Sequence, residues 1–146
     1  MPAAAVLSGP DAAAEQVDQV LFGEGFEVLD EADGFAWGQA RRDGYVGYVA
    51  SRSLGGADGP ATHRVSAIRA YAFTEPDLKS PAAGPFPLNA LMTVMALNDR
   101  FALVQGAGWV PLAHLAPIGV FESEPVAVAE RFVGVPYLWG GRDGLG

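Results

Sequence analysis

The sequence predicts a mainly β protein in which two small barrels follow one another and a short helix comes last. Two observations carry this prediction: a segment of several short strands occurs twice, and its apolar residues alternate as they do along strands. Eleven prolines and nineteen glycines divide the 146 residues into short elements. Half of the residues are hydrophobic, which is enough for one moderate core or two small ones.

The repeat appears when "FEVLDEADGFAWGQ" (26–39) is aligned without a gap with "MTVMALNDRFALVQ" (92–105), 66 residues later. Further along, "YVASRSL" (48–54) matches "WVPLAHL" (109–115) at an offset of 61, so one hairpin of the second copy is five residues shorter. Each copy predicts three strands joined by turns and then a tight helical turn. Units of about 60 residues with several short strands suit a small, partly open barrel.

The alignment also predicts burial. Val28 with Val94, and Phe35 with Phe101, are expected at equivalent buried positions. Most aromatic residues of the barrels are expected to lie in the cores, because alternating aromatic residues in small barrels are mostly core. These residues are Phe22, Phe26, Phe35, Trp37, Tyr45, Tyr48, Phe101 and Trp109.

Glycine and proline clusters divide the chain. We expect an N-terminal tail at 1–15, a first barrel at 16–56, a second barrel at 63–118 and a C-terminal segment at 124–146. The linker is "GGADGPAT" (55–62). The segment "TEPDLKSPAAGPFPL" (74–88) contains four prolines, cannot form an interior strand, and is expected to be a long loop.

The C-terminal segment begins with a helical pattern. Val126, Ala129, Phe132 and Val133 are spaced as on one helix face, which predicts a helix from about 124 to 133 that ends at Gly134. A helix this short is marginal in water, so we expect its apolar face to dock on a barrel or on another copy of the chain. The double glycine of "PYLWGGRDGLG" predicts a tight turn.

Charge and composition exclude several classes of function. The formal charge of −8, with 17 acidic and 9 basic residues and no basic run, opposes binding to nucleic acid. The first sixteen residues lack the basic region of a secretion signal, and no later stretch approaches a membrane span, which predicts a cytoplasmic protein, or a periplasmic one if the N-terminus is truncated. Without cysteine, the chain has no disulfide, thiolate metal site or cysteine nucleophile.

Two sets of motifs carry a family resemblance. "DGYVGYVASRSL" and "GAGWVPLAHL" resemble the closing strands of bacterial SH3-like domains, and "AERFVGVPYLWGGRDGLG" resembles the opening of the NlpC-type (NlpC/p60) peptidoglycan cysteine peptidases. "PYLWGG" is the most specific of these motifs. The resemblance covers about residues 16 to 146. It implies two tandem SH3-like small barrels plus an N-terminal helix fragment of a papain-like α+β peptidase domain, which would begin at 124 and be truncated at 146.

The order of these parts resembles that of the γ-D-glutamyl-L-diamino acid endopeptidases, which cut murein peptides during recycling. The resemblance implies that this chain is the scaffold and substrate-gating portion of such a hydrolase. Its partner would be a murein peptide with a free N-terminus, L-Ala-γ-D-Glu-diamino acid. In that family the glycine turn leads to an Asp-Cys-Ser-Gly motif at a helix start, where the helix dipole favours the thiolate, and a later histidine acts as the base. This chain lacks that Cys and that His, so we expect it to be inactive by itself.

The resemblance also implies three site residues. Tyr137 of "PYLWGG" would be an auxiliary catalytic residue, while Glu24 of "LFGE" and Tyr45 of "DGYVGY" would hold the free amino end of the peptide. The alternative for Glu24 is a solvated turn carboxylate, and for Tyr45 a rim aromatic residue. His63 and His114 are expected in a linker and a turn, and we expect no metal site and no cofactor.

A second function class stays open. The chain could be a stand-alone SH3-like adaptor that binds a peptide or glycan without enzymatic activity, with "PAAGPFP" a ligand for a partner's polyproline groove. Self-association through the C-terminal segment is a further expectation. Neither nucleic acid nor a membrane is expected as a partner.

Overall fold

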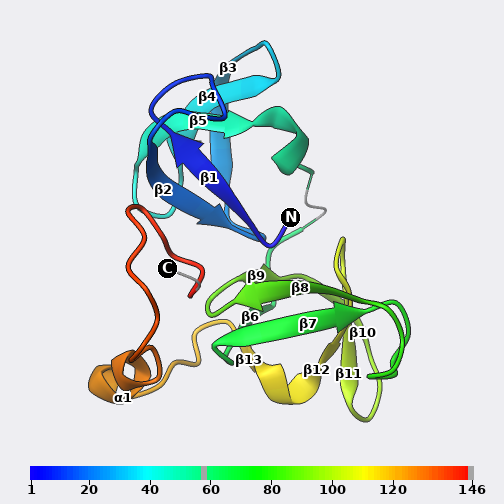
Figure 1. Cartoon of the computed structure of the whole chain (residues 1–146). Helices are drawn as coiled ribbons and strands as arrows, with labels where there is room; N and C mark the ends of the chain where they lie inside the picture. The colour runs from blue at the N-terminus through cyan, green and yellow to red at the C-terminus, as the bar shows by residue number, and fades with distance from the viewer. Residues whose placement is uncertain (57–58, 145–146) are drawn as a thin grey trace.

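The computed structural model describes residues 1–56 and 59–144, and its architecture is mainly β (Figure 1). Two antiparallel sheets of five strands lie one above the other in the figure, joined by the linker that follows the first sheet. In the described part of the chain one α-helix occurs, the short α1 (Pro125–Glu130). None of the described helices is long and apolar enough to cross a membrane.

The first barrel is built on a sheet with the strand order β2-β1-β5-β4-β3. Its elements are β1 (Ala3–Leu7), β2 (Gln16–Leu21), β3 (Phe26–Ala32), β4 (Phe35–Ala40), β5 (Val46–Ala50) and the 3₁₀ helix η1 (Ser51–Ser53). Strand β1 corrects the expectation that residues 1–15 are a tail. Its sequence, "AAAVL", carries no polar alternation, so the period-2 pattern gives no strand signal there.

The second barrel repeats this plan with the order β8-β7-β12-β11-β10, and a three-stranded sheet β13-β6-β9 is added to it. Its elements are β6 (His63–Val65), β7 (Arg69–Phe73), β8 (Ala82–Pro87), β9 (Leu91–Met92), β10 (Val94–Leu97), β11 (Phe101–Val104), β12 (Gly108–Pro111), η2 (Leu112–His114) and β13 (Leu115–Pro117). Strand β8 lies in the segment expected to be a loop. That expectation is wrong because β8 is an edge strand, where proline is tolerated.

Strand pairing confirms the internal repeat. Ala36 pairs with Val49 in the first barrel, and Ala102 pairs with Val110 in the second. Ala36 and Ala102 lie 66 residues apart, and Val49 and Val110 lie 61 residues apart, as the alignment predicts. The same 66-residue offset relates β1 to β7, so the repeat extends further toward the N-terminus than the sequence analysis places it.

The burial that the alignment predicts is found only in part. Phe101 is buried, whereas Val94 and Phe35 are half-buried. Val28 is 45% exposed. The expectation for Val28 is therefore wrong, because its side chain faces a groove between the two barrels instead of a core.

The cores are built mainly from small aliphatic side chains. The first core contains Val6, Val20, Ala40 and Val49. The second contains Val65, Ala70, Ala72, Phe86, Ala90, Met92, Val104 and Val110. Of the eight aromatic residues, Phe101 is buried, five are half-buried, and Trp37 and Tyr45 are exposed, so the expectation that most of them lie in the cores is met only in part.

Phe22 joins the two barrels. It follows β2 of the first barrel, yet it packs against the core of the second. Its ring meets Phe86 edge to face, with centroids 5.0 Å apart, and its carbonyl accepts a hydrogen bond of 2.8 Å from the N–H of Leu91. The first barrel therefore contributes a side chain to the interior of the second.

The C-terminal segment is anchored at both ends. Buried Arg64 donates to the carbonyl of Val120 at 2.7 Å and to Glu122 at 2.9 Å, which fixes the segment to the second barrel before α1. After α1 the chain returns to the first barrel beside β2 (Figure 1). Arg69 donates to the carbonyl of Gly144 at 2.7 Å and holds the far end.

Helix α1 is shorter than expected and carries no buried residue. Gly134 has the left-handed conformation expected of it, φ 91°, but lies four residues beyond the last residue of the helix. Val126, Ala129 and Val133 are exposed and Phe132 is half-buried, so most of the apolar face of this segment is uncovered. Docking of that face on another copy of the chain stays a prediction.

Candidate functional site

Glu24 lies in the tight turn that joins β2 to β3. The preceding Gly23 has φ 79°, and a side chain there would collide with the backbone of Leu91, so the turn requires glycine. Glu24 folds back, and its Oε2 accepts a hydrogen bond of 2.9 Å from the N–H of Leu21. The Glu24 side chain is only 3% exposed. A carboxylate buried to this degree requires positively charged partners.

Arg142, from the C-terminal segment, is the main partner of Glu24. Its Nη2 lies 2.9 Å from Glu24 Oε1 and its Nη1 3.1 Å from Glu24 Oε2, which is bidentate pairing. Nη1 also lies 3.3 Å from Asp43 Oδ2 and 3.7 Å from Asp18 Oδ2. Arg42 adds a second guanidinium, with Nε 3.4 Å from Glu24 Oε1. We call these five residues the acidic centre.

Close backbone contact brings Arg142 to this position. The N–H of Arg142 donates to Gln19 Oε1 at 2.6 Å, and Arg142 Nη1 donates to the carbonyl of Gln19 at 2.6 Å. Gly140 lies against β2, where a Cβ would come within 2.8 Å of the backbone at Val17 and Asp18. Its φ of 67° confirms the predicted turn, and the contact with β2 is a second reason for glycine.

The acidic centre holds more negative than positive charge. Its three carboxylates, Asp18, Glu24 and Asp43, face two guanidinium groups. Asp18 Oδ2 is buried and accepts no hydrogen bond from any described residue, since 3.7 Å to Arg142 is beyond hydrogen-bond distance. Burial raises the pKa of Asp18 above its usual 3.8, while the backbone at Gln19 and the charge of Arg142 oppose this shift.

The structure brings Glu24 and Tyr45 to one site. Tyr45 lies on the hairpin after β4, is 51% exposed, and its N–H donates to Asp43 Oδ1 at 3.3 Å. Because Asp43 contacts Arg142, and Arg142 contacts Glu24, the two predicted residues belong to one connected group. Tyr137 lies five residues before Arg142 and is 84% exposed. Within the described ranges it forms no hydrogen bond with Glu24 or Tyr45, and its role stays a prediction.

Sequence analysis missed four members of this centre, Asp18, Arg42, Asp43 and Arg142. Asp43 could have been found, because it stands in "DGYVGY" two residues before Tyr45, and Arg142 stands in "GGRDG" directly after the predicted turn. Asp18 gives no such signal, since an acidic residue in "QVDQVL" looks like the outward side of an alternating strand. In the structure its side chain points to the acidic centre instead.

The histidines take part in no candidate metal site. His63 Nδ1 lies 2.9 Å from Thr62 Oγ1. His114 Nδ1 is buried, and no described residue hydrogen bonds to it. The described residues contain no group of three or more His, Cys, Asp or Glu side chains placed to hold a metal ion.

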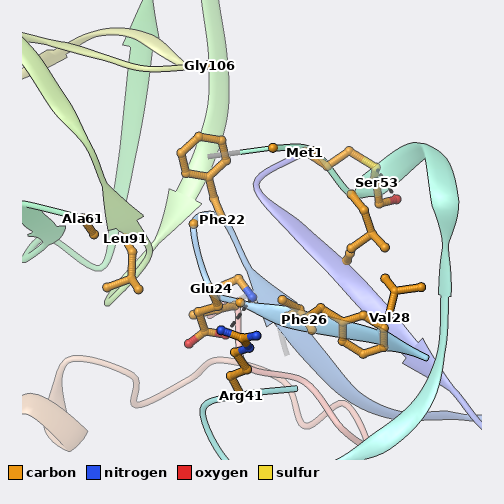
Figure 2. Close-up of a pocket in the computed structure, with 18 of the residues that line it drawn as sticks. Met1, Phe22, Glu24, Phe26, Val28, Arg41, Ser53, Ala61, Leu91 and Gly106 are labelled. Carbon is orange, nitrogen blue, oxygen red and sulfur yellow. Dashed lines mark hydrogen bonds between the residues drawn. The ribbon is translucent and has the colours of Figure 1, made fainter. Parts of the chain in front are cut away.

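A groove of about 780 Å³ lies between the barrels. Figure 2 shows Phe26 and Val28 on its first-barrel side, Leu91 and Gly106 on its second-barrel side, and Phe22 between them. Glu24 also lines it, although little of its side chain is accessible. Apolar side chains of both barrels line the groove, and the position of Val28 on its wall explains why this side chain is exposed.

Comparison with known proteins identifies part of the chain. Residues 6–54 match a family model described as "Bacterial dipeptidyl-peptidase Sh3 domain", so the first barrel is an SH3-like domain of this kind. No curated protein matches the sequence.

Among solved structures, the chain is similar to the crystal structure of an NlpC/P60 family protein from Bacillus cereus ATCC 10987. The TM-score is 0.80 at 14% identity, and the match covers 99% of this chain and 66% of that one. The structure of NlpC2 from Trichomonas vaginalis aligns with a TM-score of 0.35 at 18% identity, over 98% and 57% of the two chains. This chain therefore shares the fold of the SH3-like region of the Bacillus cereus protein and spans 66% of its length.

Proposed function

We propose that this chain is the scaffold and substrate-gating portion of a murein-peptide endopeptidase of the cysteine type. One observation carries the proposal: the segment "GGRDG", which resembles the opening of a peptidase domain, is held on the first SH3-like barrel by the Glu24–Arg142 pair. The barrel and the start of the peptidase-like segment thus contribute to one site. Such a shared site is what substrate gating by the barrel requires.

The chemistry of the acidic centre fits the free amino end of a peptide. Three carboxylates against two guanidinium groups leave one negative charge in excess, which favours a primary ammonium ligand. A capped or linked amine brings no compensating charge and leaves the carboxylates desolvated without a partner. The centre would therefore select free murein peptides, L-Ala-γ-D-Glu-diamino acid, over the polymeric wall. Tyr137 would act as an auxiliary catalytic residue beside the reacting group.

Binding to the intact 146-residue chain tests this proposal. Titration with L-Ala-γ-D-Glu-L-Lys and with its N-acetyl form, followed by NMR, should show binding of the free peptide and at least about tenfold weaker binding of the acetylated one. The chain alone should release no product from either peptide, because it has no cysteine nucleophile. Equal affinity for the two peptides would remove the gating role.

The groove favours a second candidate, an SH3-like adaptor that binds a peptide or glycan without catalysis. Its wall includes exposed Val28 and half-buried Phe26, and extended ligands use apolar walls of this kind. The coding sequence beyond Gly146 separates the two candidates. An Asp-Cys-Ser-Gly motif soon after that residue supports the endopeptidase, whereas a stop codon supports the adaptor.

A further inference from the structure

We propose that Asp43, beside Tyr45, is the residue that contacts the ammonium group of the ligand, while Glu24 and Arg142 are positioning residues. This inference rests on the proposed function and assigns the parts within its site. The carboxylates of the acidic centre differ in the number of contacts that they already make and in the exposed fraction of their side chains.

Glu24 has no free face in this structure. Oε1 meets Arg142 Nη2 at 2.9 Å and Arg42 Nε at 3.4 Å, and Oε2 meets the N–H of Leu21 at 2.9 Å and Arg142 Nη1 at 3.1 Å. A carboxylate accepts about four hydrogen bonds, so three hydrogen bonds and the Arg42 ion pair leave Glu24 little room for a further donor. With 3% of the side chain exposed, Glu24 acts as the buried anchor of Arg142.

Asp43 is the accessible carboxylate of the centre. Its side chain is 30% exposed, and each oxygen has one partner, the N–H of Tyr45 for Oδ1 and Arg142 Nη1 for Oδ2, both at 3.3 Å. Each oxygen therefore keeps a lone pair for a further donor. The exposed ring of Tyr45, two residues away, offers an aromatic face to the same cation.

Asp18 supplies independent evidence for an unfilled position. Its side chain is 8% exposed, and its Oδ2 accepts no hydrogen bond from a described residue. Asp18 and Asp43 approach the same atom, Arg142 Nη1, at 3.7 Å and 3.3 Å, so both carboxylates are close to one end of the guanidinium. Buried polar atoms normally have a hydrogen-bond partner. A primary ammonium bound at Asp43 would bring a positive charge into the neighbourhood of this buried carboxylate.

The repeat of the barrels agrees with this assignment. Asp43 lies on the hairpin that is five residues longer in the first barrel than in the second. The corresponding hairpin of the second barrel, Gln105 to Ala107, has no acidic residue. The longer hairpin thus adds the accessible carboxylate and its neighbouring aromatic residue to one copy only.

An NMR titration of the intact chain tests the assignment, with carboxyl carbons labelled with ¹³C. The probes are the dipeptide L-Ala-γ-D-Glu, which carries a single amino group, and its N-acetyl form. We expect the free dipeptide to move the carboxyl signal of Asp43, to leave that of Glu24 in place, and to leave residues 139–144 protected from hydrogen exchange. Asp43→Asn should weaken binding about tenfold, and the matched control Glu27→Gln, an exposed carboxylate of the same barrel, should bind as the wild type does.

Two results would overturn the inference. If the free dipeptide moves the Glu24 signal and releases residues 139–144, the ammonium displaces Arg142 and contacts Glu24 itself, while the proposed function stands. If the wild type binds neither dipeptide, the proposed function and this inference both fail. Unchanged unfolding of Asp43→Asn on heating ensures that weaker binding reports the lost contact and not a lost fold.

Discussion

The two barrels share strand order and pairing register, yet among the described residues the acidic centre lies on the first barrel and not on the second. Glu24 in the turn after β2 corresponds, 66 residues later, to Ala90, which is fully buried in the second core. Tyr45 corresponds, at the offset of 61, to Gly106, beside the Phe22 ring. The turn after β2 therefore carries a carboxylate in the first barrel, whereas the corresponding turn of the second barrel contributes an alanine to the core. In this molecule the barrel supplies a frame, and the candidate site is built on a turn and a hairpin.

The largest expected effect comes from transferring the charge to the second barrel. Ala90→Glu places a carboxylate in the second core, where the nearby Arg64 guanidinium is already bonded to Asn89, Val120 and Glu122, and should lower the free energy of unfolding by about 4 kcal/mol or leave the chain unfolded. Chemical denaturation followed by circular dichroism measures this. Ala83→Glu on exposed edge strand β8 is the control and should change stability by less than about 0.5 kcal/mol. Equal stability of the two variants would show that the second barrel tolerates the charge.

The next effect concerns the side chain that joins the barrels. Phe22→Ala removes the ring that packs on the second core and should cost about 3 kcal/mol, with exchange protection lost in β9 of the second barrel as well as near residue 22. Leu29→Ala, an exposed apolar residue of the first barrel, is the control. A loss of protection confined to the first barrel would contradict the joining role of Phe22.

The smallest effect is a pH dependence that belongs to the first barrel. The pKa of Asp18 is raised in the folded chain, mainly by burial, so just above the usual 3.8 the folded state keeps a proton that the unfolded state releases. Asp18 should therefore make stability fall as the pH rises through that window. Asp18→Asn should remove this contribution, whereas Asp30→Asn, on exposed β3, should not. If the free energy of unfolding depends on pH in the same way for the wild type and Asp18→Asn, the raised pKa does not belong to Asp18.

Much of the fold could be predicted because it depends on local patterns. Alternation, turn residues and the two offsets located β3 to β5 and β10 to β12. Strand β1 was missed for want of polar alternation, although Pro10-Asp11 recur as Pro76-Asp77 at the same offset of 66 and could have extended the repeat. Strand β8 was missed because proline argues against a strand only where both edges are paired.

The core and the site were harder to predict for different reasons. Aromatic residues were expected inside, but the first core is built on small side chains such as Ala40 and Val49, and five of the eight aromatic rings are only half-buried. The acidic centre joins Glu24 to Arg142 across 118 positions of sequence. No periodicity reports a contact of that separation, so the resemblance could suggest Glu24 and Tyr45 but not the guanidinium between them.

The Glu24–Arg142 pair joins the first barrel to the C-terminal segment. Hydrogen exchange of the backbone N–H groups in residues 139–144 of the intact chain tests whether this pair holds the segment on the barrel. In the wild type we expect protection at the N–H of Arg142, which is bonded to Gln19. Glu24→Gln should abolish that protection while the strands of both barrels stay protected, and Glu27→Gln should change nothing. Full protection of residues 139–144 in Glu24→Gln would contradict the central claim that this buried carboxylate holds the segment on the barrel.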